Sequence, residues 1–342
     1  MKTDLQIFAS SPCRVDFGGT LDISTFHYPL HHLQPATVNI ALEMRTKVRI
    51  LPYRKRKIKI SSKGFEPVEL VLQEAPYQHP LGFMFAICAF FNVDGIHVEI
   101  ESMSPPRSGL GGSSVAGVAL AKALSIYRNR PLSTKDAAII TQSIEASVAG
   151  VPCGMQDQLA AAYGGVNMWY WAVGRQSRDF ARIKLLSANE YVQLEKCLLV
   201  AYCGIPHESK DINGTWVRQF LMGGTYKKWE KIVHYTHQFA SAISAGDMKT
   251  AARMMNLETE IRREMTPNVI EKTGSRLIDA ALSENCGARF TGAGGGGCLW
   301  AIGPKEAIAK LKPKWQKELA SNKKGLLLPS TIARKGLVAT IV

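Results

Sequence analysis

The chain has 342 residues, of which 46% are hydrophobic, so it can bury a large core and exceeds the usual size of a single domain. Its longest uncharged apolar run, residues 81–93, is too short to span a bilayer and predicts a buried helix. The N-terminal residues do not resemble a secretion signal, and the seven scattered cysteines form no CxxC pair. The composition therefore predicts a cytoplasmic two-domain protein with reduced thiols, no structural zinc and no membrane partner.

The net charge of +14 at pH 7 would suit a nucleic acid, an anionic membrane or an anionic small molecule. Residues 45–63 hold nine of the basic residues, and several of these alternate with Val and Ile. This alternation predicts a hairpin with one solvated, charged face. Tyr53 is the only aromatic residue in the segment, whereas proteins that bind single strands need a series of exposed aromatics. The lysines of residues 305–335 are spaced as on an amphipathic surface helix. Both basic segments are thus explained as solvated surfaces, and we expect no nucleic-acid partner.

Apolar periodicity predicts strands at residues 5–10, 36–51 and 96–102, followed by helices that begin after Ser113 and at Thr134. Two further strands are expected within residues 161–174 and 195–204, and residues 213–260 are mainly helical. After a glycine cluster, the chain predicts a strand, a helix and a final strand. The mixed pattern indicates an α+β protein with one domain at residues 1–187 and a second at residues 188–342.

Residues 105–124, PPRSGLGGSSVAGVALAKAL, place glycines and serines directly before an apolar helix. Gly109, Gly111 and Gly112 would permit a close backbone approach, and Ser113 and Ser114 are expected as N-cap and first-turn residues. Free N–H groups and the positive end of the helix dipole would then converge on one point, which suits a phosphate. An ordinary capped turn is the alternative, because the segment matches neither the Walker pattern nor the dinucleotide-binding fingerprint.

Two further features accompany this loop. A second glycine cluster, residues 291–297 (TGAGGGG), favours close approach to a ligand or to another loop, because consecutive glycines lose much entropy when ordered. Glu145 is expected on a helix, and Asp157 follows a Pro-Cys-Gly break. Near a phosphate loop, two carboxylates suit one magnesium ligand and one general base. Taken singly, each carboxylate is more often a surface charge or a helix cap.

These motifs resemble those of the GHMP kinases (galactokinase, homoserine kinase, mevalonate kinase and phosphomevalonate kinase). PPRSGLGGSSV (residues 105–115) is similar to the family's phosphate loop PxxxGLGSSA, TGAGGGGC (291–298) to its C-terminal glycine motif, and SPCRVDFGGTLDIS (11–24) to its first motif. The three motifs stand in the family's order and span nearly the whole chain. GMQDQLAAAYGGVNMW (154–169) and CGIPHESKDI (203–212) are most similar to the bacterial branch with D-glycero-D-manno-heptose phosphate kinases and L-fucose kinase domains.

The resemblance implies an N-terminal domain like domain 2 of ribosomal protein S5 and a ferredoxin-like C-terminal domain. ATP and the acceptor would bind in the cleft between the domains. It implies ATP and Mg²⁺ as cofactors, a sugar or sugar phosphate as acceptor, and a monomer or homodimer as the working unit. The protein would be a small-molecule kinase that phosphorylates a hydroxyl of a heptose, fucose or galactose type of sugar.

The resemblance also implies roles for individual residues. Ser113 and Glu145 match the residues that hold magnesium, Asp157 matches the carboxylate that accepts the hydroxyl proton, and Arg14 matches an arginine near the transferring phosphate. The residues implied to hold the nucleotide are Pro106, Ser108, Gly109, Leu110, Gly111, Gly112, Ser113 and Ser114. The residues implied to meet the acceptor are Gly18, Gly19, Thr20, Asp22, His207, Ser209, Lys210, Gly294, Gly295 and Gly296.

The chain departs from the family pattern at two places. Gly112 stands where the family's loop has its first serine, which leaves the backbone cradle intact and removes one hydroxyl. In the first motif, the heptose kinase branch usually reads GGGTD, whereas here Leu21 separates Thr20 from Asp22. The residue that usually contacts sugar hydroxyls is thus displaced by one.

Two other functions fit the same motifs. A mevalonate-type kinase would keep both loops and shape its acceptor pocket for an acid, whereas the Asp-Gln and His-Glu-Ser clusters suit a polyhydroxylated ligand. A non-catalytic regulator that binds nucleotide and sugar would tolerate the loss of Glu145 or Asp157, and this chain has both.

Overall fold

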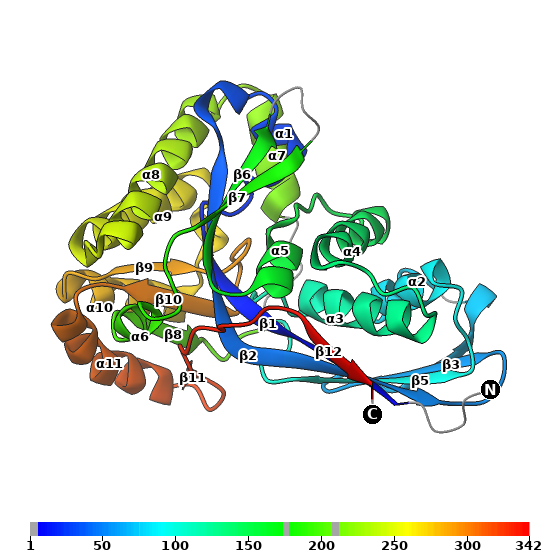
Figure 1. Cartoon of the computed structure of the whole chain (residues 1–342). Helices are drawn as coiled ribbons and strands as arrows, with labels where there is room; N and C mark the ends of the chain where they lie inside the picture. Colours follow the sequence, from blue (N-terminus) through cyan, green and yellow to red (C-terminus); the bar gives the residue numbers. More distant parts are fainter. Residues whose placement is uncertain (1–5, 75, 174–177, 207–211, 342) are drawn as a thin grey trace.

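The computed structural model describes residues 6–74, 76–173, 178–206 and 212–341. Within this part of the chain the strands form two sheets, of eight and four strands, with helices packed on both (Figure 1). The larger sheet has the order β12-β1-β2-β5-β3-β4, and β6 pairs with β2 and β7. Its strands are β1 (Ile7–Phe17), β2 (Ala36–Pro52), β3 (Lys57–Ser62), β4 (Val68–Val71), β5 (Ile96–Ser102), β6 (Val166–Val173), β7 (Arg178–Lys184) and β12 (Val338–Ile341).

The basic segment 45–63 does not form the predicted hairpin. β5 lies between β2 and β3, pairing antiparallel with the first and parallel with the second. The alternation itself is confirmed, since Val48 and Ile58 are fully buried while Lys47 is exposed. The prediction of a hairpin failed because alternation fixes which face of a strand is buried and says nothing of which strand is its neighbour.

The helices of the N-terminal part lie on and beside the larger sheet. They are α1 (Ser24–His27), α2 (Gly82–Phe90), α3 (Gly112–Tyr127), α4 (Thr134–Val148) and α5 (Gln156–Tyr163). Seven of the nine residues of α2 are buried, which confirms that the longest apolar run is a core helix. α3 and α5 lie against β1 and β2, so the N-terminus of α3 is held in a fixed position relative to the first motif (Figure 1).

The smaller sheet has the order β11-β8-β10-β9, which is the fourth, first, third and second strand of its unit. All its pairings are antiparallel, as expected of a ferredoxin-like domain. The strands are β8 (Leu198–Tyr202), β9 (Gly287–Phe290), β10 (Cys298–Ile302) and β11 (Leu326–Leu328). The helices of this half are α6 (Tyr191–Glu195), α7 (Ile212–Leu221), α8 (Tyr226–Ala245), α9 (Met248–Met265), α10 (Lys272–Ser283) and α11 (Lys305–Ala320).

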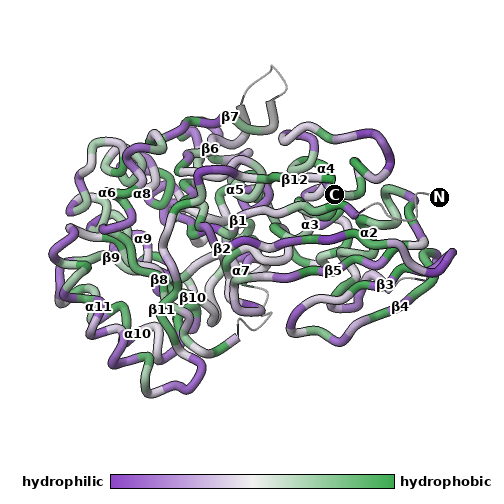
Figure 2. The backbone as a smooth tube through the Cα atoms, turned by 60° about the horizontal axis from the view of Figure 1, so that its bottom comes forward, coloured by the Kyte–Doolittle hydropathy of each residue, from purple (hydrophilic) through white to green (hydrophobic). Residues whose placement is uncertain are grey.

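The helix α11 is amphipathic, as its lysine spacing predicts. Its buried residues are Ile308, Leu311, Trp315 and Leu319, which recur every three or four positions. Figure 2 shows hydrophilic and hydrophobic residues alternating along this helix. The lysines therefore lie on a solvated face and need no partner to explain them.

The two halves of the chain share one continuous core. The ring of Phe17 in β1 stacks on that of Phe239 in α8, with the ring centroids 4.1 Å apart. Phe239 in turn contacts Trp300 of β10 in an edge-to-face arrangement. The C-terminal strand β12 returns to pair with β1 in the larger sheet. The final strand thus lies in the predicted second domain by sequence and in the larger sheet by structure. The domain boundary at residue 187 stays a prediction.

All seven cysteines are free, and five of them are buried. Among the residues described, no helix combines the length and the apolar character needed to cross a membrane.

Candidate active site

The phosphate loop, residues 105–112, connects β5 to α3. Three of its residues have left-handed backbones, with φ of 53° at Arg107, 74° at Gly109 and 78° at Gly111. α3 begins at Gly112, with Gly111 as its N-cap. The predicted cap at Ser113 is therefore wrong, because the left-handed Gly111 turns the chain into the helix two residues earlier. The first bond of the helix runs from the N–H of Val115 to the carbonyl of Gly111, and the N–H groups that precede it have no partner within the helix, as an anion site requires.

Two adjoining cavities lie near this loop, and the larger one, with a volume of about 390 Å³, is directly in front of it. The loop and the first turn of α3 contribute Pro105, Pro106, Arg107, Ser108, Gly109, Gly111, Gly112, Ser113 and Ser114 to the lining. Apolar side chains that the sequence did not single out form another part of it: Phe65, Pro80, Leu81, Met84 and Ile100. Leu110, which was also expected here, is fully buried in the core. A polar end with loop amides and an apolar end suit a nucleotide.

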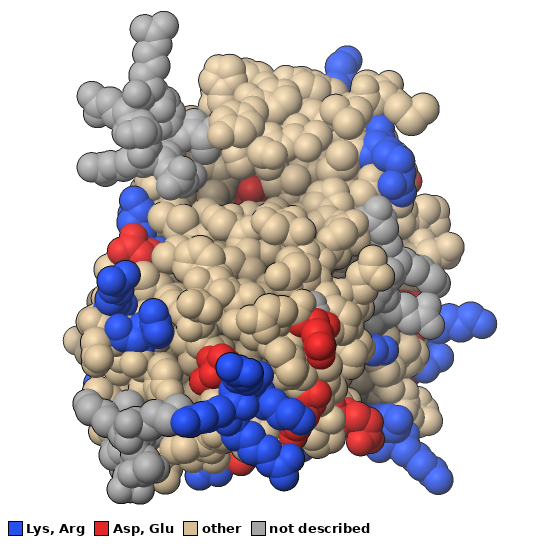
Figure 3. All heavy atoms as spheres, turned by 90° about the vertical axis from the view of Figure 1, so that its right-hand side faces the viewer, with Lys and Arg blue, Asp and Glu red and all other residues tan. Residues whose placement is uncertain are grey.

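A smaller cavity of about 130 Å³ adjoins the first. Its own lining is polar: Thr20, Asp22, Cys153, Gly154, Gln156, Gln158 and Asn213, with Ile23. Six residues line both cavities, and we call them the shared wall: Arg14, Ser114, Glu145, Asp157, Gly292 and Ala293. Figure 3 shows a hollow with an acidic side chain at its base, surrounded mostly by uncharged residues, while Lys, Arg, Asp and Glu gather on the lower part of the same face.

Arg14 of β1 binds Asp157 of α5 at the shared wall. Nε of Arg14 donates to Oδ1 of Asp157 at 2.8 Å, and Nη2 lies 2.7 Å from the same oxygen. Nη1 donates to the carbonyl of Gly109 at 2.7 Å. Burial lowers the pKa of Arg14, but the carboxylates of Asp157 and Asp16 outweigh it and hold that pKa above its ordinary value. One guanidinium thus joins the carboxylate to the phosphate loop.

Burial also affects Asp157. It raises the pKa of this carboxyl above its ordinary range, and the guanidinium of Arg14 opposes the shift. The resulting carboxylate is a stronger base than an exposed aspartate, while the ion pair keeps its orientation fixed.

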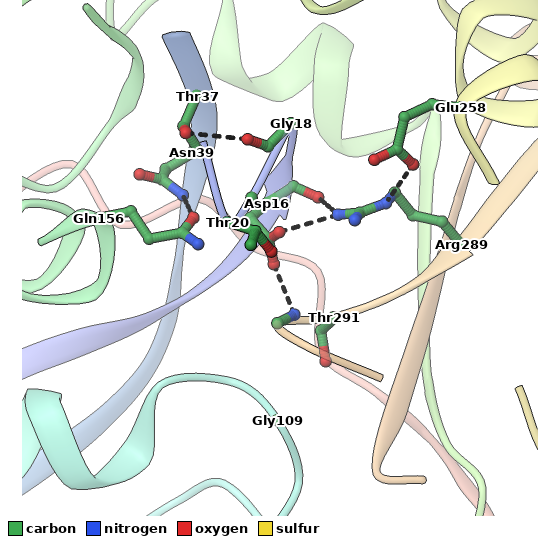
Figure 4. A network of polar contacts seen from close by, with 12 residues as sticks. Asp16, Gly18, Thr20, Thr37, Asn39, Gly109, Gln156, Glu258, Arg289 and Thr291 are labelled. Carbon is green, nitrogen blue, oxygen red and sulfur yellow. Dashed lines mark hydrogen bonds and ion pairs between the residues drawn. The ribbon is translucent and has the colours of Figure 1, made fainter. Parts of the chain in front are cut away.

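Asp157 and Arg14 are the first two members of a buried series of ion pairs that the sequence analysis did not predict. The side chains alternate in sign in the order Asp157, Arg14, Asp16, Arg289, Glu258 and Arg262. Oδ2 of Asp16 lies 2.8 Å from Nη1 of Arg289, and Glu258 accepts from Arg289 at 3.2 Å and from Arg262 at 2.9 Å. Figure 4 shows Asp16, Arg289 and Glu258 in order along this series. The alternation matters because an unpaired buried charge is strongly destabilising.

Glu145 pairs with Ser114 rather than with the predicted Ser113. The hydroxyl of Ser114 donates to Oε2 of Glu145 at 2.7 Å, and the amide of Gln158 donates to the same oxygen. Ser113 is exposed and lines only the larger cavity. Successive helical residues point about 100° apart, so only one of the two serines faces α4. Burial raises the pKa of Glu145 to about 7.

Glu145 and Ser114 present the hard oxygen ligands that magnesium prefers. Within the described part of the chain, no three His, Cys, Asp or Glu residues are grouped so as to hold a metal ion on their own. Magnesium at nucleotide sites usually takes its remaining ligands from phosphates and water. The two side chains therefore fit a magnesium ion that arrives with a nucleotide.

The first motif places two of its four predicted acceptor residues at the smaller cavity. Thr20 and Asp22 line it, and Oδ2 of Asp22 accepts the N–H of Gln156 at 2.9 Å. Burial raises the pKa of Asp22 to about 6, and the nearby carboxylates Asp157 and Asp16 add to the shift.

Gly18 and Gly19 of the first motif make contacts with the surrounding protein scaffold. Neither is part of the lining that the described residues give to the two cavities. The carbonyl of Gly18 accepts from Thr37 at 3.0 Å, and that of Gly19 accepts from Arg262 at 2.6 Å. The structure thus places the carbonyls of both glycines against the scaffold, and their contact with an acceptor stays a prediction.

The C-terminal glycine motif also reaches the site through different residues than expected. Gly292 and Ala293 belong to the shared wall, whereas Gly294, Gly295 and Gly296 are outside the lining formed by described residues. The N–H groups of Gly294 and Gly295 donate to the carbonyls of Thr291 and Val269.

The motif also packs on the phosphate loop. The N–H of Cys298 donates to the carbonyl of Ser108 at 2.8 Å. A Cβ at Gly297 would lie 2.5 Å from that same carbonyl oxygen, so this contact requires glycine. Gly297 therefore serves the contact between the two loops, and contact of Gly294, Gly295 and Gly296 with an acceptor stays a prediction. The last three predicted acceptor residues, His207, Ser209 and Lys210, lie outside the described residues.

Comparisons with known proteins agree with this geometry. The model of the GHMP kinases N terminal domain matches residues 79–165, and that of the GHMP kinases C terminal domain matches residues 239–321. The chain belongs to the GHMP kinase family. The first matched range contains the phosphate loop and three of the six residues of the shared wall, Ser114, Glu145 and Asp157.

Curated relatives of this GHMP kinase include two sugar kinases. A galactokinase from Glaesserella parasuis is 24% identical over 252 residues, which cover 64% of each chain. A D-glycero-alpha-D-manno-heptose 7-phosphate kinase from Campylobacter jejuni is 27% identical over 198 residues, covering 57% of this chain and 58% of the relative. The matches thus span less than two thirds of these relatives.

The fold of this GHMP kinase matches solved structures over almost its whole length. A D-glycero-D-manno-heptose 1-phosphate kinase from Bacteroides thetaiotaomicron superposes with a TM-score of 0.73, covering 98% of this chain and 99% of the other, at 16% identity. The two-domain GHMP kinase fold is therefore confirmed.

Proposed function

We propose that this GHMP kinase transfers the γ-phosphoryl group of ATP to a hydroxyl of a sugar or sugar phosphate. One observation carries the proposal: the two cavities meet at the shared wall, where Asp157, Glu145 and Ser114 all lie. A nucleotide phosphate in the larger cavity and an acceptor hydroxyl in the smaller one would come together at this wall. The sugar kinases among the relatives support the choice of acceptor.

The larger cavity would hold the nucleotide. Its apolar part, which includes Phe65 and Met84, suits the base, and the phosphate loop and the N-terminus of α3 suit the phosphates. Lys63 and Arg107 also line this cavity and add two cations to its rim. Phosphoryl transfer depends on alignment and charge neutralisation, which these groups would supply.

Ser114 and Glu145 would hold the magnesium ion, in place of the pair Ser113 and Glu145. When bound, the ion neutralises charge that develops on the transferring phosphate. Gln158 would keep the carboxylate of Glu145 directed at the shared wall through its amide. Ser113 would contribute to the nucleotide lining alone.

Asp157 would accept the proton of the attacking hydroxyl. It lies at the shared wall and is held at Oδ1 by Arg14, which leaves Oδ2 for the acceptor. Because Arg14 also holds the carbonyl of Gly109, the base and the phosphate loop keep a constant relative position. Such pre-alignment contributes much of the rate in reactions of this class.

The smaller cavity would hold the acceptor. Asp22, Gln156 and Asn213 offer carboxylate oxygens and amide groups, which match the donors and acceptors of a sugar ring. Arg14 is the sole cation in the lining given by the described residues, and its donors are already used by Asp157, Asp16 and Gly109. An acid such as mevalonate would need a basic clamp, so this lining favours a sugar even though mevalonate kinases also occur among the relatives.

A coupled assay of ADP release over free hexoses, heptoses and their phosphates tests the proposal. We expect at least one of these sugars to stimulate ADP release in the presence of magnesium, with mevalonate as the negative comparison. A non-catalytic regulator would bind ATP and sugar without releasing ADP. Thermal denaturation with ATP, with and without magnesium, separates that outcome from a failure to bind nucleotide at all.

A further inference from the structure

We infer that Asp16 is the residue that positions the catalytic centre, acting through Arg14 and the glycine motif. The inference rests on the proposed function, because it concerns the alignment of Asp157 with the phosphate loop. Asp16 itself is part of neither cavity lining formed by the described residues, so it would touch neither substrate.

Asp16 is fully enclosed and bonds to residues from both halves of the chain. Its Oδ1 accepts the N–H of Gly292 at 2.7 Å and lies 3.4 Å from Nη1 of Arg14. Its Oδ2 accepts from Nη1 of Arg289 at 2.8 Å. A Cβ at Gly19 would lie 2.3 Å from Oδ2, so the loop of the first motif closes tightly over this carboxylate.

Two of these partners belong to the shared wall. Arg14 donates hydrogen bonds to Asp157 and to the carbonyl of Gly109. Gly292 is the first residue of the glycine motif that lines both cavities. Asp16 is therefore the one described side chain that bonds to both Arg14 and Gly292. If the carboxylate were lost, Asp157 and the glycine motif would lose their common anchor.

The isosteric change Asp16→Asn removes this anchor without changing its size. Both oxygens of Asp16 accept from donors, so an asparagine in either orientation directs its NH₂ group at a donor. Arg14 and Arg289 would also face each other without the charge between them. Arg14 would then be free to shift, and Asp157 would move with it.

Glu258 provides a matched control from the same series of ion pairs. It is also fully buried and lies between two arginines, Arg289 and Arg262, at 3.2 Å and 2.9 Å. Neither arginine belongs to the lining that the described residues give to the larger or the smaller cavity. Glu258→Gln therefore removes an equivalent buried charge at a place that does not contact the shared wall.

The experiment measures kcat, the KM for both substrates, the Kd for ATP and thermal stability in the wild type, Asp16→Asn and Glu258→Gln. We expect both variants to lose similar stability, because each leaves buried arginines undercompensated. Only Asp16→Asn should lose turnover, with kcat falling about 10- to 100-fold while the Kd for ATP stays within about threefold. An equal fall of kcat in both variants, or none in Asp16→Asn, would overturn the inference.

A second variant covers the case in which Asp16→Asn does not fold. Asp16→Asn with Arg289→Met removes both charges of the pair, and the methionine can pack where the Arg289 guanidinium lies over Phe17 and Phe290. This double variant should regain stability and keep the low kcat, because Arg14 still lacks its anchor. A wild-type kcat in the folded double variant would contradict the inference, whereas an inactive wild type would instead reject the proposed function.

Discussion

Arg14 and Asp157 stand 143 positions apart in the sequence, yet Nε of Arg14 donates a hydrogen bond of 2.8 Å to Oδ1 of Asp157. The same guanidinium holds the carbonyl of Gly109 at 2.7 Å. One buried side chain thus fixes the distance between a carboxylate and the phosphate loop. Because phosphoryl transfer needs the acceptor hydroxyl aligned with the phosphate, this connection explains why a rigid first motif is part of the site.

The pairing of Ser114 with Glu145 predicts which serine serves magnesium. Ser114→Ala and Glu145→Gln should each raise the magnesium concentration for half-maximal activity by about 10-fold, because each removes one oxygen ligand. Ser113→Ala removes the neighbouring hydroxyl, which has no bond to Glu145, and serves as the control. The second measurement is the magnesium-dependent gain in thermal stability with ATP. Greater sensitivity to magnesium in Ser113→Ala than in Ser114→Ala would restore the assignment made from the sequence.

Two arginines with left-handed backbones allow a test of the nucleotide cavity. Arg107, with φ of 53°, lines this cavity, and Arg56, with φ of 62°, lies in the turn between β2 and β3. Glycine relieves the strain at either position, so Arg107→Gly and Arg56→Gly should each leave stability within about 0.5 kcal/mol of the wild type.

The two glycine variants should differ in their affinity for ATP. Arg107→Gly should weaken ATP binding by about 3- to 10-fold, because a charged contact with phosphate contributes about 1 kcal/mol. Arg56→Gly should leave ATP binding unchanged, since this residue lies outside the lining formed by the described residues. Titration of ATP by calorimetry gives both values. Equal ATP affinity in the two variants would remove Arg107 from the nucleotide site.

Asp22 should make the stability of the protein depend on pH. Burial raises its pKa from 3.8 to about 6 in the folded state, so the folded protein holds this proton more tightly than the unfolded chain. The stabilisation is present below about pH 4 and is lost as pH rises through about 6. Asp22→Asn is free of this loss and should be about 3 kcal/mol more stable than the wild type at pH 7.5, with the difference vanishing near pH 4.

Urea denaturation at pH 4, 5, 6 and 7.5 measures this difference. Asp94→Asn, which removes one exposed carboxylate outside the described lining of both cavities, is the control for the change of net charge. A difference between Asp22→Asn and the wild type that stays constant with pH would show that Asp22 titrates normally in the folded protein.

The sequence predicted the family, the α+β fold and the main members of the site because these are carried by local patterns. Glycine runs, an apolar helix and strand alternation are visible in a few consecutive residues. The hydrogen bond between Ser114 and Glu145 was not visible, because it depends on where α3 begins and on which face of that helix meets α4. The helix begins after the left-handed Gly111, whereas the two serines that follow had predicted a later start.

The buried charges were harder to predict because their partners are far apart in the sequence. Asp16 and Arg289 each sit in a strand among apolar residues, which was a signal that the sequence analysis left unused. A charge in an apolar strand must find a partner, yet 273 positions separate these two residues. The apolar side of the nucleotide cavity was missed for the same reason, since Phe65, Leu81 and Ile100 come together only in the fold.

In the proposed reaction, the γ-phosphoryl group of ATP passes to a sugar hydroxyl with Asp157 as the base. The most direct measurement is sugar-dependent release of ADP by the wild type and by Asp157→Asn, with ATP affinity and thermal stability measured for both. We predict that a sugar or sugar phosphate stimulates ADP release by the wild type, and that Asp157→Asn binds ATP normally but turns over about 100-fold more slowly or worse. The account is contradicted if no sugar stimulates ADP release, or if the folded Asp157→Asn variant turns over at nearly the wild-type rate.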